Sequence, residues 1–455
     1  MTRKQIDTAA IRERDRDHVW HPLFQHRLLE QQDLMVLDRG EGCYLFDSEG
    51  RRYLDGYSGL WNVNVGYGRN EIAAAVHEQL QRLPYYPQSQ INEPAATLAA
   101  RLAEILPGDL RHVFYSNSGS EANETAFKIA RQYGRQKFPG QNRYKIISRY
   151  QGYHGFTFGA MSATGQTSRR SKFEPLVPGF LHVDPPYCFR CPLKLTYPGC
   201  GIACVEEIEE VIRREDPETV AAVVAEPVIG GGGVIVPPDE YLPRLRAICD
   251  RYGVLLILDE VITGFGRTGA LFAAQHWDVV PDMMTLAKGV TSGYLPLAAC
   301  VVRPHVFETF LGEPGERREL AQVSTYGGHP ACCAAALANI DILLSERLSE
   351  NAEKVGSYLL NKLAALRSPV LGEVRGKGLM LALELTEPDG RELLNAGATA
   401  AVKGGIRDAG VLVGQMSHVI PAPESILYLA PPLILTREEA DVIVDAVTAG
   451  LRRAA

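Results

Sequence analysis

Several stretches of the chain are uniformly apolar rather than alternating, which is the pattern of strands buried on both faces of a parallel sheet. Three such runs are Val220 to Ala225, Leu255 to Leu258 and Ala298 to Val302. Between the first two lies a longer segment with helical character, Tyr241 to Tyr252. Strands that alternate with helices predict an α/β fold built on a mostly parallel, doubly wound sheet.

The same patterns predict further elements on both sides of this region. We expect helices at Asn70 to Leu83, Glu93 to Leu106, Glu124 to Tyr133 and Ala331 to Leu348, and strands at Arg111 to Tyr115 and Lys145 to Ser148. Near the N-terminus a helix and an extended piece precede short strands with Gly and Asp turn signals. After about Gly372 strands return, at Gly378 to Leu385, Val411 to Val413 and Ile426 to Leu429.

These patterns divide the chain into two domains. A length of 455 residues is too great for one small core. We expect a large cofactor-binding domain over 61–330 and a small α+β domain over 331–455. The short strands of 1–60 are expected to join the small domain.

A carboxylate and a lysine follow two of the apolar runs. Asp259 follows Leu258, and Lys288 follows the shorter run Met283 to Leu286. A buried lysine can lose its proton and attack a carbonyl, whereas a buried aspartate needs a cationic partner. The pair suits pyridoxal phosphate, whose aldehyde reacts with lysine and whose ring nitrogen pairs with aspartate. A helix cap and a surface loop are the plainer alternatives for these two residues.

A run of small residues between a strand and a helix predicts an anion-binding turn. Ser118, Gly119 and Ser120 follow the strand that ends at Tyr115. Backbone N–H groups and the helix dipole at such a turn favour a phosphate. The alternative is a serine N-cap with a glutamate three residues later. We favour the phosphate site because the run of small residues is longer than a cap requires.

Two other strand ends carry chemically useful groups. Tyr153 and His154 stand between Gly152 and Gly155, and an aromatic ring in such a place can lie flat on a planar ligand. Glu226 directly follows Val220 to Ala225. Because the carboxyl ends of parallel strands share one edge of the sheet, these residues are expected to meet near Asp259 and Lys288.

The composition of the chain excludes some classes of binding partner. The 47 Lys and Arg against 54 Asp and Glu give a net charge of −7, so no basic field favours nucleic acid or an anionic membrane. The first twenty residues are highly charged and resemble no secretory signal. No apolar run reaches the roughly 20 residues of a membrane span. We therefore expect a cytoplasmic protein without nucleic-acid or membrane partners.

Four of the nine cysteines crowd into one segment, at Cys188, Cys191, Cys200 and Cys204. Two close pairs are what a tetrahedral zinc site requires, but the distance between the pairs is shorter than in the usual zinc patterns. A locally packed surface segment with free thiols is the alternative. We assign no metal to the site near Lys288.

Taken in order, these motifs resemble the class III pyridoxal-phosphate-dependent aminotransferases of fold type I over nearly the whole chain. The motifs that carry the resemblance are Ser118 to Asn123, Gly152 to Gly155, Glu226-Pro227, Leu258 to Val261, Gly264 to Gly269, Ala287 to Gly289, Thr325 to Pro330 and Val374 to Leu379. Each motif is weak alone, but their order and spacing are specific. The resemblance implies a transaminase that takes an amine donor and a keto-acid acceptor.

The resemblance also implies a role for each matching residue. Lys288 would be the Schiff-base lysine and proton carrier, and Asp259 would pair with the pyridinium nitrogen. Cofactor contacts would further come from Ser118, Gly119, Ser120, Tyr153, His154, Glu226, Val261 and Thr325. Thr325 would reach the cofactor phosphate of the neighbouring subunit, so the active unit would be a homodimer, alone or paired into a tetramer.

Within the family, the chain is similar to the ω-amino-acid and amine:pyruvate branch, in which Leu23, Trp61 and Tyr153 would line the substrate pocket. Ornithine-type members carry an arginine where this chain has Tyr428, before Ala430-Pro431-Pro432. Amine transaminases use a mobile arginine from a loop that here reads Val413 to Met416, with extra residues Ser417 to Ser425. No arginine matches either position. The cysteine segment and the longer loop resemble taurine:pyruvate aminotransferases.

The sequence therefore predicts a ping-pong transfer of an amino group from an ω-amino acid or primary amine, such as β-alanine or taurine, to pyruvate. One alternative keeps the cofactor but rearranges a single substrate, as an aminomutase of the glutamate-1-semialdehyde type does. Another is an ω-aminotransferase that uses 2-oxoglutarate. A third, a cofactor-free homologue that only binds partners, is disfavoured because Lys288, Asp259 and the small-residue turn are all present.

Overall fold

A computed structural model describes residues 6–390, 392–416 and 425–454. Its centre is a seven-stranded sheet with the strand order β4-β10-β9-β8-β7-β5-β6. The strands are β4 (His112–Ser116), β10 (Ala298–Val302), β9 (Met283–Leu286), β8 (Leu255–Asp259), β7 (Val220–Ala225), β5 (Lys145–Arg149) and β6 (Phe180–Val183). All but β10 run in the same direction, and β10 is antiparallel to both of its neighbours. The predicted α/β fold with a mostly parallel sheet is confirmed.

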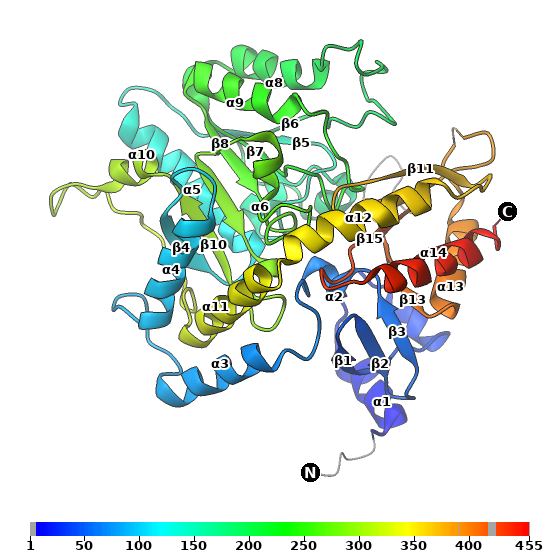
Figure 1. The fold of residues 1–455 in the computed structure, drawn as a ribbon. Helices are drawn as coiled ribbons and strands as arrows, with labels where there is room; N and C mark the ends of the chain where they lie inside the picture. Colours follow the sequence, from blue (N-terminus) through cyan, green and yellow to red (C-terminus); the bar gives the residue numbers. More distant parts are fainter. Residues whose placement is uncertain (1–5, 391, 417–424, 455) are drawn as a thin grey trace.

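Helices cover both faces of this sheet, which explains why its strands are apolar without alternation. On one face, Ile257 of β8 belongs to the same core cluster as Phe127 of α5 (Gly119–Lys137). On the other face, Leu256 and Leu258 belong to a cluster with residues of α8 (Ala203–Arg214) and α9 (Tyr241–Tyr252). Figure 1 shows α8 and α9 together on one side of the sheet.

Two smaller sheets lie beyond the central one. The first has the order β1-β2-β3-β13, and its strands are β1 (Leu37–Glu41), β2 (Tyr44–Asp47), β3 (Arg52–Asp55) and β13 (Val411–Leu412). The second has the order β11-β12-β15-β14, with β11 (Leu371–Gly376), β12 (Leu381–Leu385), β15 (Ile426–Leu429) and β14 (Gly414–Gln415). β13 pairs in parallel with β3, so the first sheet joins both ends of the chain. The boundaries 1–60, 61–330 and 331–455 stay a prediction.

Long helices connect and cover these sheets. They are α3 (Asn70–Arg82), α4 (Glu93–Ile105), α11 (Pro330–Ser345), α12 (Leu348–Ala364), α13 (Ala396–Asp408) and α14 (Arg437–Leu451). α11 packs on α3 and α4, whereas α14 packs on α12 and α13. In Figure 1 the blue N-terminal strands lie beside the orange and red helices α13 and α14.

Short helices fill most of the remaining turns. These are α1 (Thr8–His18), η1 (His26–Glu30), α2 (Ser58–Trp61), α6 (Phe158–Ala163), α7 (Thr167–Arg170), η2 (Ser171–Phe173), η3 (Pro217–Thr219), η4 (Ala273–Trp277), η5 (Lys288–Val290), α10 (Pro304–Phe307) and η6 (Glu308–Phe310). None of the helices in the described ranges is both long and apolar enough to cross a membrane.

Two predicted helices differ from the structure. The helix expected from Glu124 begins at Gly119, because Ser118 is its N-cap and accepts a hydrogen bond from the Glu121 backbone N–H. The helix expected over Ala331 to Leu348 ends at Ser345, and Arg347 in the left-handed region separates α11 from α12.

Candidate active site

The carboxyl-end edge of the central sheet gathers most of the residues that the sequence singled out. The loops and strand ends after β4, β5, β7, β8 and β9 lie next to one another because these strands are neighbours that run in one direction, apart from the intervening β10. They carry Ser118, Gly119, Ser120, Tyr153, His154, Glu226, Asp259, Val261 and Lys288. This is where open α/β sheets place their ligand sites.

Three donors hold the Asp259 carboxylate in one orientation. Oδ2 accepts a hydrogen bond from the Asn123 side-chain amide at 2.8 Å and lies 2.8 Å from His154 Nδ1. Oδ1 accepts from the Val261 backbone N–H at 3.0 Å. Asp259 and His154 are both buried. A buried carboxylate fixed in this way can keep a proton on the nitrogen of a cofactor ring that it faces.

Glu226, whose charge interacts with that of Asp259, holds the loop that carries Tyr153. Its Oε1 accepts a hydrogen bond from the Tyr153 backbone N–H at 2.9 Å, and its Oε2 accepts from the Gly230 N–H at 2.8 Å. Burial raises the pKa of the Glu226 carboxyl, and the nearby Asp259 carboxylate adds to this shift, while His154 opposes it. Glu226 therefore fixes the loop that presents Tyr153.

Lys288 follows β9 in the left-handed region of backbone space, with φ of +40°. Burial lowers the pKa of its ammonium group, whereas the Asp259 and Glu226 carboxylates act in the opposite direction. The Lys288 side-chain nitrogen forms no hydrogen bond or ion pair with a residue of the described ranges. A lysine held near two carboxylates but bonded to neither can act as a nucleophile or carry a proton.

The start of α5 has features that suit an anion. A side-chain carbon added to Gly119 would lie only 2.9 Å from a Val261 methyl carbon, so the residue must be glycine for the backbone to approach Val261 this closely. Ser120 Oγ accepts a hydrogen bond from the Phe156 backbone N–H at 3.1 Å. The first turn of a 19-residue helix provides N–H groups and a favourable dipole for a phosphate.

These features fit pyridoxal phosphate. The ring nitrogen would face Asp259, the aldehyde would face Lys288 and the phosphate would meet the first turn of α5. The charge of Lys288 interacts with Asp259 and Glu226, yet Lys288 forms no ion pair with either carboxylate. Its amine is therefore available to an aldehyde. The absence of a side chain at Gly119 lets the start of α5 lie close to Val261.

The remaining predicted residues lie farther out. Trp61 is buried and stacks on Tyr428, with ring centroids 4.3 Å apart and an angle of 9° between the planes. Leu23 and Thr325 are exposed, and the Thr325 carbonyl accepts a hydrogen bond from the Tyr85 hydroxyl at 2.7 Å. Within this chain, Leu23 and Thr325 are therefore not buried at the candidate active site.

Sequence reasoning missed two residues at the site. Asn123 ends one of the family motifs but received no role, although it binds Asp259 and accepts a hydrogen bond from Thr285 Oγ1 at 3.0 Å. Arg169 of α7 was not singled out, yet its guanidinium lies 5.0 Å from the centre of the Tyr153 ring. Only the helical spacing of Asn123 from Gly119 could have indicated the first, and no local pattern indicates the second.

The loop that corresponds to the mobile arginine loop of amine transaminases falls mostly on 417–424, outside the described residues. The four clustered cysteines line one cavity of about 20 Å³ in the described structure. No group of three or more His, Cys, Asp or Glu residues in the described ranges is arranged to hold a metal ion.

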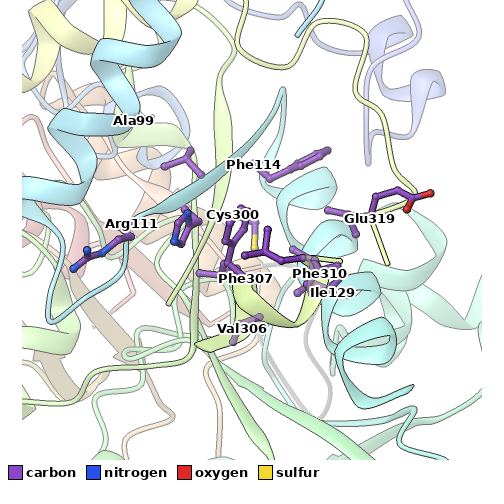
Figure 2. A pocket seen from close by; sticks show the side chains of 14 residues that line it. Ala99, Arg111, Phe114, Ile129, Cys300, Val306, Phe307, Phe310 and Glu319 are labelled. Atoms are coloured by element: carbon purple, nitrogen blue, oxygen red, sulfur yellow. The ribbon is translucent and has the colours of Figure 1, made fainter. Parts of the chain in front are cut away.

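A larger apolar cavity of about 520 Å³ lies apart from this chemistry. Figure 2 shows its lining side chains, which include Arg111, Phe114, Cys300 and Phe307. They come from the start of β4, the end of the antiparallel β10 and the helix α10. That is the opposite end of the sheet from Lys288, so this cavity is separate from the candidate active site.

Comparison with known proteins agrees with this geometry. The chain matches the family model described as aminotransferase class-III over residues 28–451. It is 45% identical to an uncharacterized aminotransferase, YhxA, of Bacillus subtilis, over 96% of both chains. It is 40% identical to the taurine–pyruvate aminotransferase of Bilophila wadsworthia, over 98% of this chain and 97% of that protein.

A solved structure shows the same agreement in three dimensions. It is a thermostable (S)-enantioselective omega-transaminase from Thermomicrobium roseum, with a TM-score of 0.93 and 45% identity over 99% of this chain and 100% of that one. The family match covers far more than half of the residues, and both relatives cover nearly the whole chain. This chain therefore belongs to the class III aminotransferases, which depend on pyridoxal phosphate.

Proposed function

We propose that this transaminase moves the amino group of an ω-amino acid or other primary amine, such as β-alanine or taurine, to pyruvate. Transamination and the cofactor follow from the family. The identity of donor and acceptor is the proposal. It is supported by the functions that two similar proteins are named for, a taurine–pyruvate aminotransferase and an omega-transaminase.

The observation that carries the donor class is the side chain at Tyr428. Ornithine-type members of the family carry an arginine there, which would hold an α-carboxylate. Here the position is filled by a phenol ring stacked on Trp61. Tyr428 is buried, and a side-chain carbon on Gly414 would overlap its ring, so the ring is held in place. An apolar wall at this point favours a donor without an α-carboxylate.

Asp259 and Lys288 have different roles in the proposed reaction. When bound, pyridoxal phosphate supplies an aldehyde for the amino group and an electron-withdrawing ring. Asp259, held by Asn123 and His154, keeps a proton on the ring nitrogen. The Lys288 amine, whose pKa burial lowers, takes a proton from the substrate carbon and returns it in the next step.

Other residues position the cofactor. The first turn of α5, with Ser118, Gly119 and Ser120, would hold the phosphate, while Tyr153 and Val261 would lie on the two sides of the ring. Exposure of Thr325 on a surface loop suits a contact with the phosphate site of a second subunit, so we propose a homodimer as the minimal active unit. A cytoplasmic location is part of the same proposal.

An absorbance experiment tests the proposed substrates. Purified enzyme loaded with pyridoxal phosphate is mixed separately with β-alanine, taurine or 1-phenylethylamine, without an acceptor. Loss of the yellow absorbance with one of these donors, and its return on adding pyruvate, is the expected result. Return with 2-oxoglutarate but not with pyruvate would change the acceptor. Complete conversion of glutamate-1-semialdehyde without any added keto acid would instead support the aminomutase alternative.

A further inference from the structure

The proposed substrates carry a carboxylate or sulfonate, and a partner for that charge is missing from the two positions at which the family carries an arginine. Tyr428 is not a cation, and Val413 to Met416 contains no arginine. The buried arginines around the site are mostly committed to other groups. Arg149 donates to the Glu226 carbonyl, and Arg267 donates to the carbonyls of Leu379 and Pro431.

Arg169, which is only partly buried, is different from these arginines. Its guanidinium lies 5.0 Å from the centre of the Tyr153 ring and 5.6 Å from the centre of the Phe156 ring. Its Nε is buried without a hydrogen-bond partner, and the guanidinium pairs with no carboxylate among the residues that the structure describes. The adjacent Arg170, in contrast, bonds the His182 ring and the Thr164 carbonyl.

The surroundings of Arg169 position its charge on the substrate side of the site. Tyr153 is anchored to Glu226 and is the residue expected to lie on the cofactor ring. Tyr428, which stacks on Trp61, is the other tyrosine whose charge interacts with Arg169. The guanidinium therefore lies within electrostatic reach of both aromatic walls of the proposed pocket.

Physical chemistry explains what such a residue does. Taking a charge out of water is costly unless an opposite charge or hydrogen bonds replace the water. Burial lowers the pKa of Arg169, while Tyr153 and Tyr428 are the groups that oppose this shift. The rings of Tyr153 and Phe156 offset part of this cost through cation–π contacts with the guanidinium, and a bound anion would offset more of it. A planar guanidinium binds two oxygens of one carboxylate or sulfonate at once.

We propose that Arg169 binds the anionic end of the substrates: the carboxylate of the keto-acid acceptor and the carboxylate or sulfonate of the ω-amino donor. This inference rests on the proposed function, since it names the group that recognises those substrates. It assigns to α7 the task that the ornithine-type members give to the position of Tyr428.

Two substrate pairs test the proposal. For the charged pair, taurine and pyruvate, Arg169→Gln is expected to lower kcat/KM by about 10- to 100-fold, mainly by raising KM. This is the effect expected when a bound substrate loses one charged hydrogen-bonding partner. For the uncharged pair, 1-phenylethylamine and butanal, kcat/KM is expected to change by less than about threefold. Arg169→Lys should recover part of the loss because it keeps the charge without the planar fork.

A binding measurement removes the dependence on turnover. Calorimetric titration of the loaded enzyme with propanoate, an unreactive carboxylate, should give a Kd that rises by about 10-fold or more in Arg169→Gln. The matched control is Lys172→Gln, which removes an exposed positive charge three residues away and should leave every value unchanged. If Arg169→Gln does not fold, the propanoate titration of Arg169→Lys replaces it.

The outcomes separate this inference from the function on which it rests. Equal losses for charged and uncharged pairs, or no loss with either, would overturn the role of Arg169. An unaltered propanoate Kd in both Arg169 variants would do the same. If the unsubstituted enzyme transferred no amino group from any donor, the proposed function would fail, while the propanoate titration would still decide whether Arg169 binds an anion.

Discussion

The indole ring of Trp61 lies parallel to the phenol ring of Tyr428, with their centroids 4.3 Å apart. The two residues come from opposite ends of the chain, Trp61 at the end of α2 and Tyr428 within β15. Aromatic pairs in contact contribute roughly 0.5–1.5 kcal/mol beyond the area they bury. This pair therefore joins the two ends of the chain and forms an apolar wall beside the proposed substrate pocket.

Replacing Tyr428 by Ala should both destabilise the enzyme and widen its donor range. Removing a buried aromatic ring costs about 3–5 kcal/mol, and Trp61 loses its neighbour. We expect a lower melting temperature, and a kcat/KM ratio of bulky aryl amine to taurine that rises. Tyr428→Phe keeps the ring and should retain both properties. An alanine variant with unchanged stability and selectivity would show that the wall does not limit the donor.

Replacing Lys288 by Ala should nearly abolish turnover. The variant loses the amine that we propose carries the proton, and positioned acid–base groups contribute about 10²- to 10⁴-fold to rate. The expected result is a kcat at least about 10³-fold lower, measured by alanine formation from pyruvate. Turnover at the original rate would show that the assigned role is wrong.

A matched measurement separates chemistry from folding in that variant. Lys288 forms no side-chain hydrogen bond or ion pair within the described ranges, so its removal should leave the melting temperature of the cofactor-free enzyme close to that of the unsubstituted protein. A large fall in that temperature would instead assign the lost activity to damage of the fold.

Gly119→Ala should weaken binding of pyridoxal phosphate. The added carbon would lie 2.9 and 3.0 Å from the two methyl carbons of Val261, so Val261 or the first turn of α5 must move. Overpacking of this kind costs about 1–3 kcal/mol, which corresponds to a Kd about 5- to 150-fold higher. Absorbance titration of the cofactor-free enzyme with pyridoxal phosphate measures this Kd.

Gly404→Ala is the control for the glycine prediction. A carbon added at Gly404 of α13 has no neighbour within 4 Å, so the substitution tests only the general effect of losing a glycine in a helix. Its cofactor Kd should be unchanged and its stability equal or higher. The same Kd for both variants would show that the close approach of Gly119 and Val261 does not matter for phosphate binding.

Glu260 should make stability depend on pH. Burial raises the pKa of this carboxyl from 4.5 to about 7, against hydrogen bonds from Thr263, Ala273 and Ala274 that lower it. The folded state thus keeps a proton that the unfolded chain releases above pH 4.5. The contribution of Glu260 to stability therefore falls as the pH rises from about 4.5 to 7, by about 3 kcal/mol in total, and is constant above 7.

The comparison of melting temperatures between the unsubstituted enzyme and Glu260→Gln isolates this residue, because other titrating groups affect both proteins equally. The difference in melting temperature in favour of the unsubstituted enzyme should decrease between pH 5 and pH 8. Glu313→Gln, at an exposed position, should show no such change relative to the unsubstituted enzyme. A constant difference for Glu260→Gln would mean that Glu260 is already ionised in the folded protein at pH 5.

Much of the central sheet, and the position of Asp259 and Lys288 at its carboxyl edge, could be predicted from the chain alone. The strands Val220–Ala225, Leu255–Asp259 and Ala298–Val302 are uniformly apolar because helices cover both of their faces, and this pattern is visible without a structure. Lys288 and Asp259 were predictable for the same reason, since each comes at the end of such a strand or just after it. Strand ends on one sheet edge lie together whatever the loops do.

Contacts that depend on loop paths were not predictable. Arg169 lies beside Tyr153 because an isolated bridge between Tyr150 and Gly165 folds the intervening segment back on itself. No periodicity in a four-residue helix signals that fold. The start of α5 differs from the prediction because a run such as Ser118-Gly119-Ser120 has the composition of a loop, although a serine cap also starts a helix.

The parallel pairing of β3 with β13 sets an order for folding during synthesis. Leu54 pairs with Val411, so the sheet begun by the first strands stays incomplete until most of the chain has left the ribosome. Contacts between such distant residues form slowly, and an unpaired strand edge can join another chain. During that interval the edge of β3 has no partner strand, and a chain that stops before β13 would keep that edge exposed for its lifetime.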